Sequence, residues 1–303
     1  MKSNALTRCD MLAALAVIFI WGFNFVITKF ALRDFSPFQL GAVRFTLAWM
    51  PLIFFIKPPQ VHWKWVVLYG LFQGVGQFGL MFIALNVGLT TAMGSVLLQT
   101  QVFFTALFGF LLLRENVARQ LQIGLVLAAL GLVCFTLNFV VPGAGDSGAS
   151  TVLGFVLILC SAAMWAASNI VARCAQQQQA QYSAISFVVW SSGVAIIPFI
   201  ALSYFFDDES IRWHWLNAHW TSWLAVAYLS WIATLTGYGF WTYLLKRHPA
   251  NKIAPFGLGV PVVGLATGMI VLNEVITPWQ WAGIALLVAA LVSVMLGARI
   301  KRA

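Results

Sequence analysis

Long apolar stretches alternate with short polar ones along the whole chain. A membrane-spanning helix needs about 20 mostly apolar residues, and the sequence offers ten such stretches. They cover residues 10–31, 37–56, 64–86, 91–113, 120–140, 152–173, 183–205, 220–245, 252–272 and 278–298. Turn-forming pairs such as Ser36-Pro37, Pro58-Pro59 and Thr277-Pro278 separate neighbouring stretches. The pattern predicts an all-α membrane protein with ten transmembrane helices.

Composition agrees with a membrane protein. The 303 residues are 61% hydrophobic and 8% charged, whereas soluble domains carry about 25% charged residues. The first stretch is longer than the core of a signal peptide, about 7–15 residues, so we expect it to be a retained helix. The four cysteines are scattered without a paired spacing, which indicates neither a disulfide framework nor a metal site. No basic, aromatic-interleaved segment indicates nucleic acid, and no cofactor is expected.

Lysine and arginine in the loops predict the orientation, because cytoplasmic loops are enriched in both. If the N-terminus is cytoplasmic, only Arg33 and Arg212 fall in outer segments. The thirteen in inner segments are Lys2, Arg8, Lys57, Lys64, Arg114, Arg119, Arg173, Lys246, Arg247, Lys252, Arg299, Lys301 and Arg302. We therefore expect a multi-pass protein with both termini in the cytoplasm.

The chain also repeats itself. Residues 103–130 align without a gap onto residues 262–289, which places Glu115 on Glu274, Gly109 on Gly268 and Gly124 on Gly283. The loop 140–151 lies between the halves, so we expect repeats over residues 1–145 and 150–303. Five spans is an odd number, so the second repeat must be inverted relative to the first. Inverted repeats are typical of alternating-access transporters, whose substrate site lies near the midplane at the repeat interface.

Several motifs carry a family resemblance. They are WGFNFV (21–26), PFQLGAVRF (37–45), and the repeated segments LLLRE (111–115) and IVLNE (270–274). On these the chain resembles the drug/metabolite transporter superfamily, EamA-type, over essentially its whole length. VLLQTQVFFT (96–105), TGYGFW (236–241) and APFGLGVPVVGLA (254–266) are similar to the bacterial exporters of O-acetylserine and cysteine. The resemblance implies a secondary transporter of the bacterial inner membrane that exports small amino-acid-like metabolites.

Two charges lie well inside predicted spans, where an ionisable residue indicates a functional site. Arg44 is seven residues past Pro37, about 10 Å into its helix at 1.5 Å per residue, with the small Gly41 and Ala48 at helical spacing. Its planar guanidinium fits a substrate carboxylate. The alternative is a structural role, with the guanidinium bonded to helix carbonyls or to a polar neighbour. Lys29 is close to the outer end of its helix, and we expect its long side chain to reach the interface.

Polar and aromatic residues mark candidate cavity-lining positions on the first helix of each half. Trp21, Asn24 and Thr28 share one helix face, and Ser161, Trp165 and Asn169 form a similar stripe in the second half. The stripes predict a cavity wall, although Asn also serves to bond helices together in membranes.

Further candidates lie on the third, fourth and eighth spans. Gln73 and Gln77 share a face, whereas Gln99 and Gln101 are about 200° apart, so both cannot face one narrow path. Ser95 and Gln99 form one polar stripe of this span, and Gln101 and Thr105 form the other. The sequence does not decide which stripe lines the path. Aromatic and hydroxyl side chains follow each other at helical spacing in the eighth span: Trp231, Thr234, Tyr238 and Trp241.

Other classes of function fit less well. The four histidines lie in or beside loops, and no nucleophile elbow, phosphate loop, HExxH motif or carboxylate pair is present, so we expect no enzyme and no metal site. A channel or a structural membrane protein is the alternative of another class. Within transport, aromatic amino acids are the alternative substrates. The expected partners are a small-molecule substrate and the lipid bilayer, and a homodimer is left open.

Overall fold

The computed structural model of the protein describes residues 7–114, 119–140, 152–179, 182–248 and 253–300, and these form helices and connections without a strand. A helical segment lies on each of the ten predicted stretches. In the first half the segments are α1 (Arg8–Ala31); α2 (Pro37–Ile53); α3 (Trp63–Tyr69), η1 (Gly70–Gly79) and α4 (Leu80–Asn86) in succession; α5 (Thr91–Leu97), η2 (Leu98–Thr100) and α6 (Gln101–Leu113) in succession; and α7 (Arg119–Val140). In the second half they are α8 (Val152–Gln178); α9 (Ala184–Phe206); α11 (Trp220–Ala227), η4 (Tyr228–Thr236) and α12 (Gly237–Arg247) in succession; η5 (Ala254–Leu258) with α14 (Gly259–Val271); and α15 (Pro278–Ile300). The short α10 (Glu209–Arg212) and η3 (His214–Asn217) connect α9 to α11.

Six of these helical segments are long and apolar enough to cross a membrane. They run over Arg8–Ala31, Trp63–Asn86, Thr91–Leu112, Arg119–Asn138, Val152–Gln178 and Ala184–Phe206. Two shorter helices, Phe256–Val271 and Pro278–Val294, are also apolar. The fold is therefore an all-helical membrane protein.

Local sequence explains where the first two helices begin. Thr7 and Asp10 form a capping box at the start of α1, and Ser36 and Gln39 form another at the start of α2, where Pro37 occupies the first turn. Such boxes satisfy main-chain N–H groups that a helix start otherwise leaves without partners.

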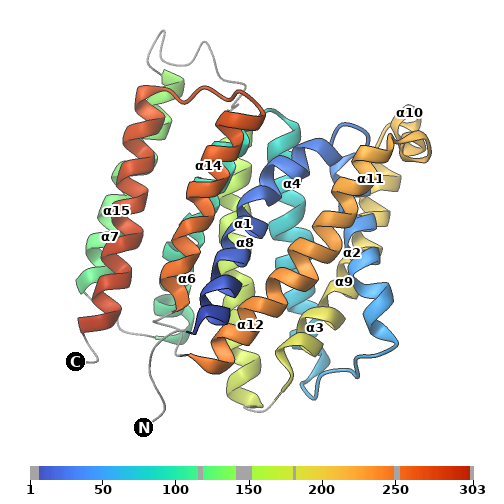
Figure 1. Ribbon diagram of the computed structural model, residues 1–303, viewed down its shortest axis with the longest axis horizontal. Coiled ribbons are helices and arrows are strands. Elements are labelled where there is room, and N and C mark those ends of the chain that lie inside the picture. Colours follow the sequence, from blue (N-terminus) through green and yellow to red (C-terminus); the bar gives the residue numbers. More distant parts are fainter. Residues whose placement is uncertain (1–6, 115–118, 141–151, 180–181, 249–252, 301–303) are drawn as a thin grey trace.

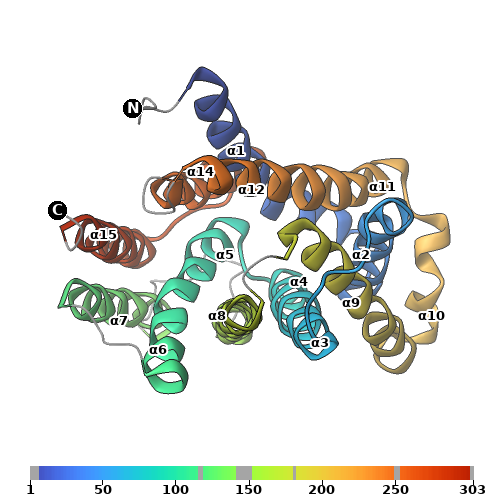
Figure 2. The same ribbon diagram turned by 90° about the horizontal axis from the view of Figure 1, so that it is seen from below.

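The helices are arranged in two layers (Figures 1 and 2). Layer one contains α1, α2, the α11–η4–α12 segment and α14, and layer two contains the α3–η1–α4 segment, the α5–η2–α6 segment, α8 and α9. The layers meet along two edges, where α2 packs on α9 and α14 packs on α5. The predicted repeat relates the first four spans of one half to those of the other. Each span of layer one therefore corresponds to a span of layer two.

The helices α7 and α15 form a separate pair beside the layers (Figure 1). Their packing is close because Gly131 and Gly283 face one another, so that a side chain at either would meet the main chain of the other. Both helices are almost uniformly apolar, as their sequences indicate, and neither contributes to the contacts of the site described below.

Both halves interrupt their α-helices at corresponding places. The third segment contains the π-helix η1 in the first half and η4 in the second, and the fourth contains the 3₁₀ turns η2 and η5. Arg114 and Asn273, which correspond in the repeat, both have φ of 54°. Glu115 and the loop between the halves are outside the described residues. π-Helical turns are rare and concentrate at functional sites. The residues around η1 and η4 are therefore candidates for the functional site.

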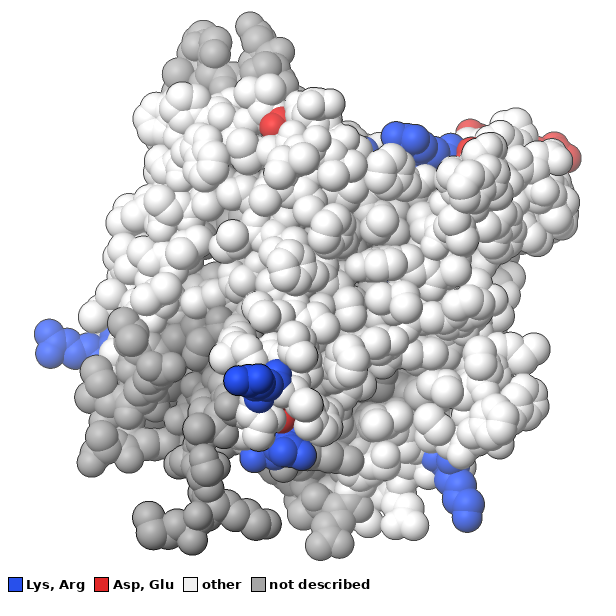
Figure 3. Space-filling view, viewed as in Figure 1, with Lys and Arg blue, Asp and Glu red and all other residues white. Residues whose placement is uncertain are grey.

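Charge differs between the two ends of the molecule. We call the end where α1 begins and α15 ends the terminal end, and the opposite end, next to α10, the far end (Figure 1). On the face shown in Figure 3, lysine and arginine gather mostly at the terminal end and the acidic residues mostly at the far end. This distribution agrees in direction with the loop charges counted along the sequence.

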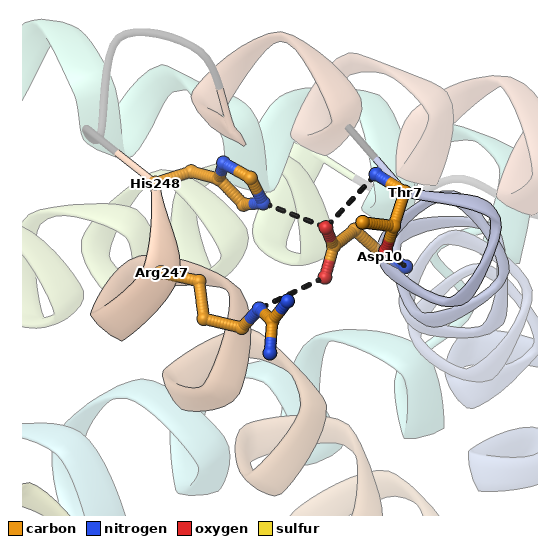
Figure 4. Close-up of polar contacts among 4 residues, drawn as sticks. All are labelled: Thr7, Asp10, Arg247 and His248. Carbon is orange, nitrogen blue, oxygen red and sulfur yellow. Dashed lines mark hydrogen bonds and ion pairs between the residues drawn. The ribbon is translucent and has the colours of Figure 1, made fainter. Parts of the chain in front are cut away.

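A buried carboxylate joins two helices of layer one at the terminal end. Asp10 of α1 is fully buried and lies between Arg247 and His248 at the end of α12 (Figure 4). Its oxygens are 3.3 Å from Nε of Arg247 and 2.8 Å from Nε2 of His248, and one also accepts from the main-chain N–H of Thr7 at 3.0 Å. One side chain thus caps α1 and holds α12 against it.

Candidate functional site

Arg44 is the most buried cation of the described chain, with 2% of its surface exposed. Its Nη2 donates to the hydroxyl of Thr234 at 3.3 Å, and its guanidinium lies over the ring of Phe78, 4.2 Å from the centroid. Nε and Nη1 have no hydrogen-bond partner among the described residues. A buried cation with unused donors is costly, so the geometry favours an anionic group that arrives from outside the chain.

A small cavity lies next to Arg44 and between the two layers. Layer one contributes Phe45, Thr234 and Tyr238 to its wall, and layer two contributes Tyr69, Gly70, Gln73, Gly74, Phe78, Val188, Ser191 and Ser192. Arg44 contacts this wall through Thr234 and Phe78. The cavity therefore combines aromatic faces, one amide and several hydroxyls with a cation at its edge.

The two serines of α9 differ in a way that the sequence does not reveal. Ser192 donates to the carbonyl of Val188 in its own helix at 2.8 Å. Ser191 is 1% exposed, and its hydroxyl has no partner among the described residues. Sequence analysis missed both, because serine in an apolar helix usually bonds its own main chain, and only tertiary structure shows which one does not.

Three predicted aromatic residues come together, and a fourth does not. The ring of Trp21 lies 5.2 Å from that of Tyr238 and 5.6 Å from that of Trp241, and its indole donates to the carbonyl of Ala233 at 3.0 Å. Trp231 is 46% exposed and donates to Leu47 of α2, away from the cavity wall. The reason is η4, whose i→i+5 bonding changes the angle between successive side chains and so separates Trp231 from Thr234 and Tyr238.

The predicted amides form two separate groups. Gln73 donates to Gln77 at 3.0 Å and accepts from Ser168 of α8 at 2.5 Å. Further along α8, Asn169 donates to Gln101 at 3.1 Å and to Thr105 at 3.2 Å. Trp165, on the same helix, packs against the main apolar core. The bonds of Ser168 and Asn169 join α8 to its neighbours in layer two, so the amides hold that layer together. Gln73 alone among them lies on the cavity wall.

Gln99 and Asn24 occupy different surroundings. Gln99 donates to the carbonyl of Gly257 at 3.3 Å, so it faces layer one at the edge where α5 and α14 meet, while Gln101 faces α8. The Oδ1 atom of Asn24, which is 8% exposed, has no partner among the described residues. Asn24 thus keeps a buried acceptor without a partner in the described part of the chain, and its cavity-lining role stays a prediction.

Lys29 does not extend to the interface as its position near the helix end predicts. Its ammonium donates to the main-chain carbonyl of Leu85 in α4 at 2.6 Å, and the residue is only partly exposed. The expectation for Lys29 is wrong because the end of α4 lies within reach of α1. A carbonyl at the end of α4 that has no helical partner attracts the ammonium.

The chain is similar to known proteins over nearly its whole length. The family model described as "EamA-like transporter family" matches residues 9–137 and again residues 152–296. A protein of Salmonella typhimurium named "Probable amino-acid metabolite efflux pump" is 35% identical over 299 residues, covering 98% of both chains. The protein of the same name from Escherichia coli is 33% identical with the same coverage. One solved crystal structure matches with a TM-score of 0.62 and 18% identity over 97% of this chain and 99% of that chain, which shows a shared fold.

Proposed function

Because the chain belongs to the EamA-like transporter family, we propose that it exports small amino-acid-like metabolites of the cysteine and O-acetylserine type. The family and the two efflux-pump relatives indicate a membrane transporter of small metabolites and not an enzyme. The names of those relatives support amino-acid metabolites as the substrate class, and the sequence motifs of residues 96–105, 236–241 and 254–266 support the narrower choice.

Arg44 carries the proposal. Its unpartnered Nε and Nη1 at a small polar cavity suit the carboxylate of a zwitterion, since charge-assisted hydrogen bonds are among the strongest a protein makes. Tyr69 and Tyr238 offer aromatic rings to the ammonium through cation–π contact, and Gln73 and Ser191 offer oxygen acceptors. In our proposal Trp21 and Asn24 line the way to this site.

We further propose ten transmembrane helices with both termini in the cytoplasm, so that the far end is the outer end. The loop charges support this orientation. Transport then takes place by alternating access, in which the two layers, related by the inverted repeat, tilt against each other around the cavity.

The extracellular amino-acid profile of cells that overproduce the protein tests the substrate. Cysteine and O-acetylserine should rise relative to the empty vector. If phenylalanine or tryptophan rises instead, the aromatic alternative is correct and the exporter proposal stands in its broader form.

Counterflow in proteoliposomes separates a transporter from a channel. Unlabelled substrate on one side should accelerate the movement of labelled substrate from the other side. A channel would show no such stimulation, and that outcome would contradict alternating access.

A further inference from the structure

The turn between α4 and α5 is held at both ends by charged side chains of the opposite layer. Lys29 of α1 donates to the carbonyl of Leu85, in the last turn of α4, at 2.6 Å. Glu274, which follows α14, accepts from the main-chain N–H groups of Thr91 and Ala92 at 2.7 and 2.8 Å. It also accepts from the hydroxyl of Thr91 at 3.0 Å. The two charged residues therefore hold the two helix ends that flank residues 87–90.

Each charge matches the helix end that it holds. A helix ends in carbonyls with partial negative charge and begins with N–H groups of partial positive charge, so a cation belongs at the first and an anion at the second. Lys29 and Glu274 act on the same turn, one at each of its ends. Together they form what we call the clasp, made of Lys29, Glu274 and the main-chain groups of Leu85, Thr91 and Ala92.

Local structure places Glu274 for this contact. Asn273 has φ of 54°, and Asn tolerates that left-handed conformation better than most residues. The turn brings the N–H of Glu274 to the carbonyl of Gly268 at 3.2 Å and its carboxylate back over α14. A Cβ at Gly268 would collide with that carboxylate and would lie 2.8 Å from the Thr91 hydroxyl oxygen. A glycine is needed here because the two layers approach so closely.

The clasp joins the layers at the far end. Lys29 and Glu274 belong to layer one or its direct continuation, whereas α4 and α5 belong to layer two (Figures 1 and 2). The Asp10 contact at the terminal end is different, because α1 and α12 lie in the same layer (Figure 4). Movement of one layer against the other must therefore break the clasp, but it need not break the Asp10 contact.

We propose that Lys29 and Glu274 form the outer gate of the transport path, closed in this structure and opened when both release the α4–α5 turn. The inference rests on the proposed function, since a gate requires a path. Release is reversible because all of the partners are main-chain groups at helix ends, together with one hydroxyl, and water can replace the charged side chains there once the mouth is open.

Labelling of a single cysteine at the cavity wall tests the gate. In a variant without Cys9, Cys134, Cys160 and Cys174, Ser192→Cys provides the reporter, and a membrane-impermeant thiol reagent is added to the outside of intact cells. Loss of a charged hydrogen bond should favour the open form about tenfold. Lys29→Met and Glu274→Ala should therefore each accelerate labelling of the reporter by about that factor, and Lys29→Arg, which keeps a donor, should accelerate it less.

Two control variants remove charge from the far end without touching the clasp. Arg33 follows Lys29 by four residues and lies over the ring of Phe30, and Glu209 is exposed on α10. Arg33→Gln and Glu209→Gln should leave the labelling rate unchanged. If Lys29→Met and Glu274→Ala fold normally and label no faster than these controls, the clasp is a permanent tie and the proposal is overturned.

A reversible crosslink tests the closed state directly. The pair Thr91→Cys and Glu274→Cys replaces the hydrogen bond between the Thr91 hydroxyl and the Glu274 carboxylate by two thiols on the two sides of the layer contact. Oxidation should stop export, and reduction should restore it. Equal export before and after oxidation would overturn the gate. If the unmodified protein exports none of the tested metabolites, the proposed substrate fails, while the labelling result still decides the gate.

Discussion

The guanidinium carbon of Arg44 lies 4.2 Å from the centre of the Phe78 ring, so a cation of layer one rests on an aromatic side chain of layer two. The contact spans the space between the layers next to the cavity. A substrate held by Arg44 would touch both layers at once, and its binding would then be coupled to their relative position.

Replacing Arg44 by Gln should abolish most export while the protein still folds. A charge partner in a partly dehydrated site contributes about 2–5 kcal/mol to binding, so the apparent affinity for substrate should fall by at least about 30-fold. Uptake into inverted vesicles measures this as a rise in KM. Membrane insertion, monitored by the amount of purified protein, should be unchanged. If Arg44→Gln transports as well as the wild type, Arg44 has a structural role and does not bind substrate.

Ser191 and Ser192 allow a comparison of neighbouring hydroxyls. The Ser191 hydroxyl is free for substrate, so Ser191→Ala should raise KM about threefold to tenfold, the effect of one neutral hydrogen bond. The Ser192 hydroxyl already bonds its own helix, and Ser192→Ala should have a smaller effect. An equal effect of both substitutions would contradict the assignment of Ser191 to the site.

Orientation can be tested with two exposed positions at opposite ends. Ser210 of α10 marks the far end and the native Cys9 marks the terminal end. With the other three cysteines replaced, an impermeant reagent outside the cell should label Ser210→Cys and spare Cys9. Labelling of Cys9 alone would reverse the proposed topology.

Asp10 should contribute to stability through α12 as well as through its own helix. Asp10→Asn keeps an acceptor for the N–H of Thr7 but removes the charge that faces Arg247 and His248. It should lower the thermal midpoint in detergent more than Thr7→Ala, which removes only the side-chain part of the cap. The opposite order would show that Asp10 acts mainly as a helix cap.

The sequence alone determined the helical class and the segments that become helices. Runs of about 20 apolar residues allow little else in a membrane, because main-chain groups there must bond within the segment. The caps at Thr7 and Ser36 follow from local chemistry in the same way. Arg44 could be selected from sequence because a cation so deep in a span needs an explanation.

Only the tertiary structure decided which polar side chains face the cavity and which bond helices together. Trp231 and Tyr238 do not share a helix face because η4 departs from the α-helical period. The residue types in η4 do not predict that departure. Lys29 has its partner 56 residues away, in the main chain of Leu85, where any residue would offer the same carbonyl. The pattern of side chains along the sequence does not predict a contact to a main-chain group. The role of Lys29 could therefore be seen only once the two layers were placed against each other.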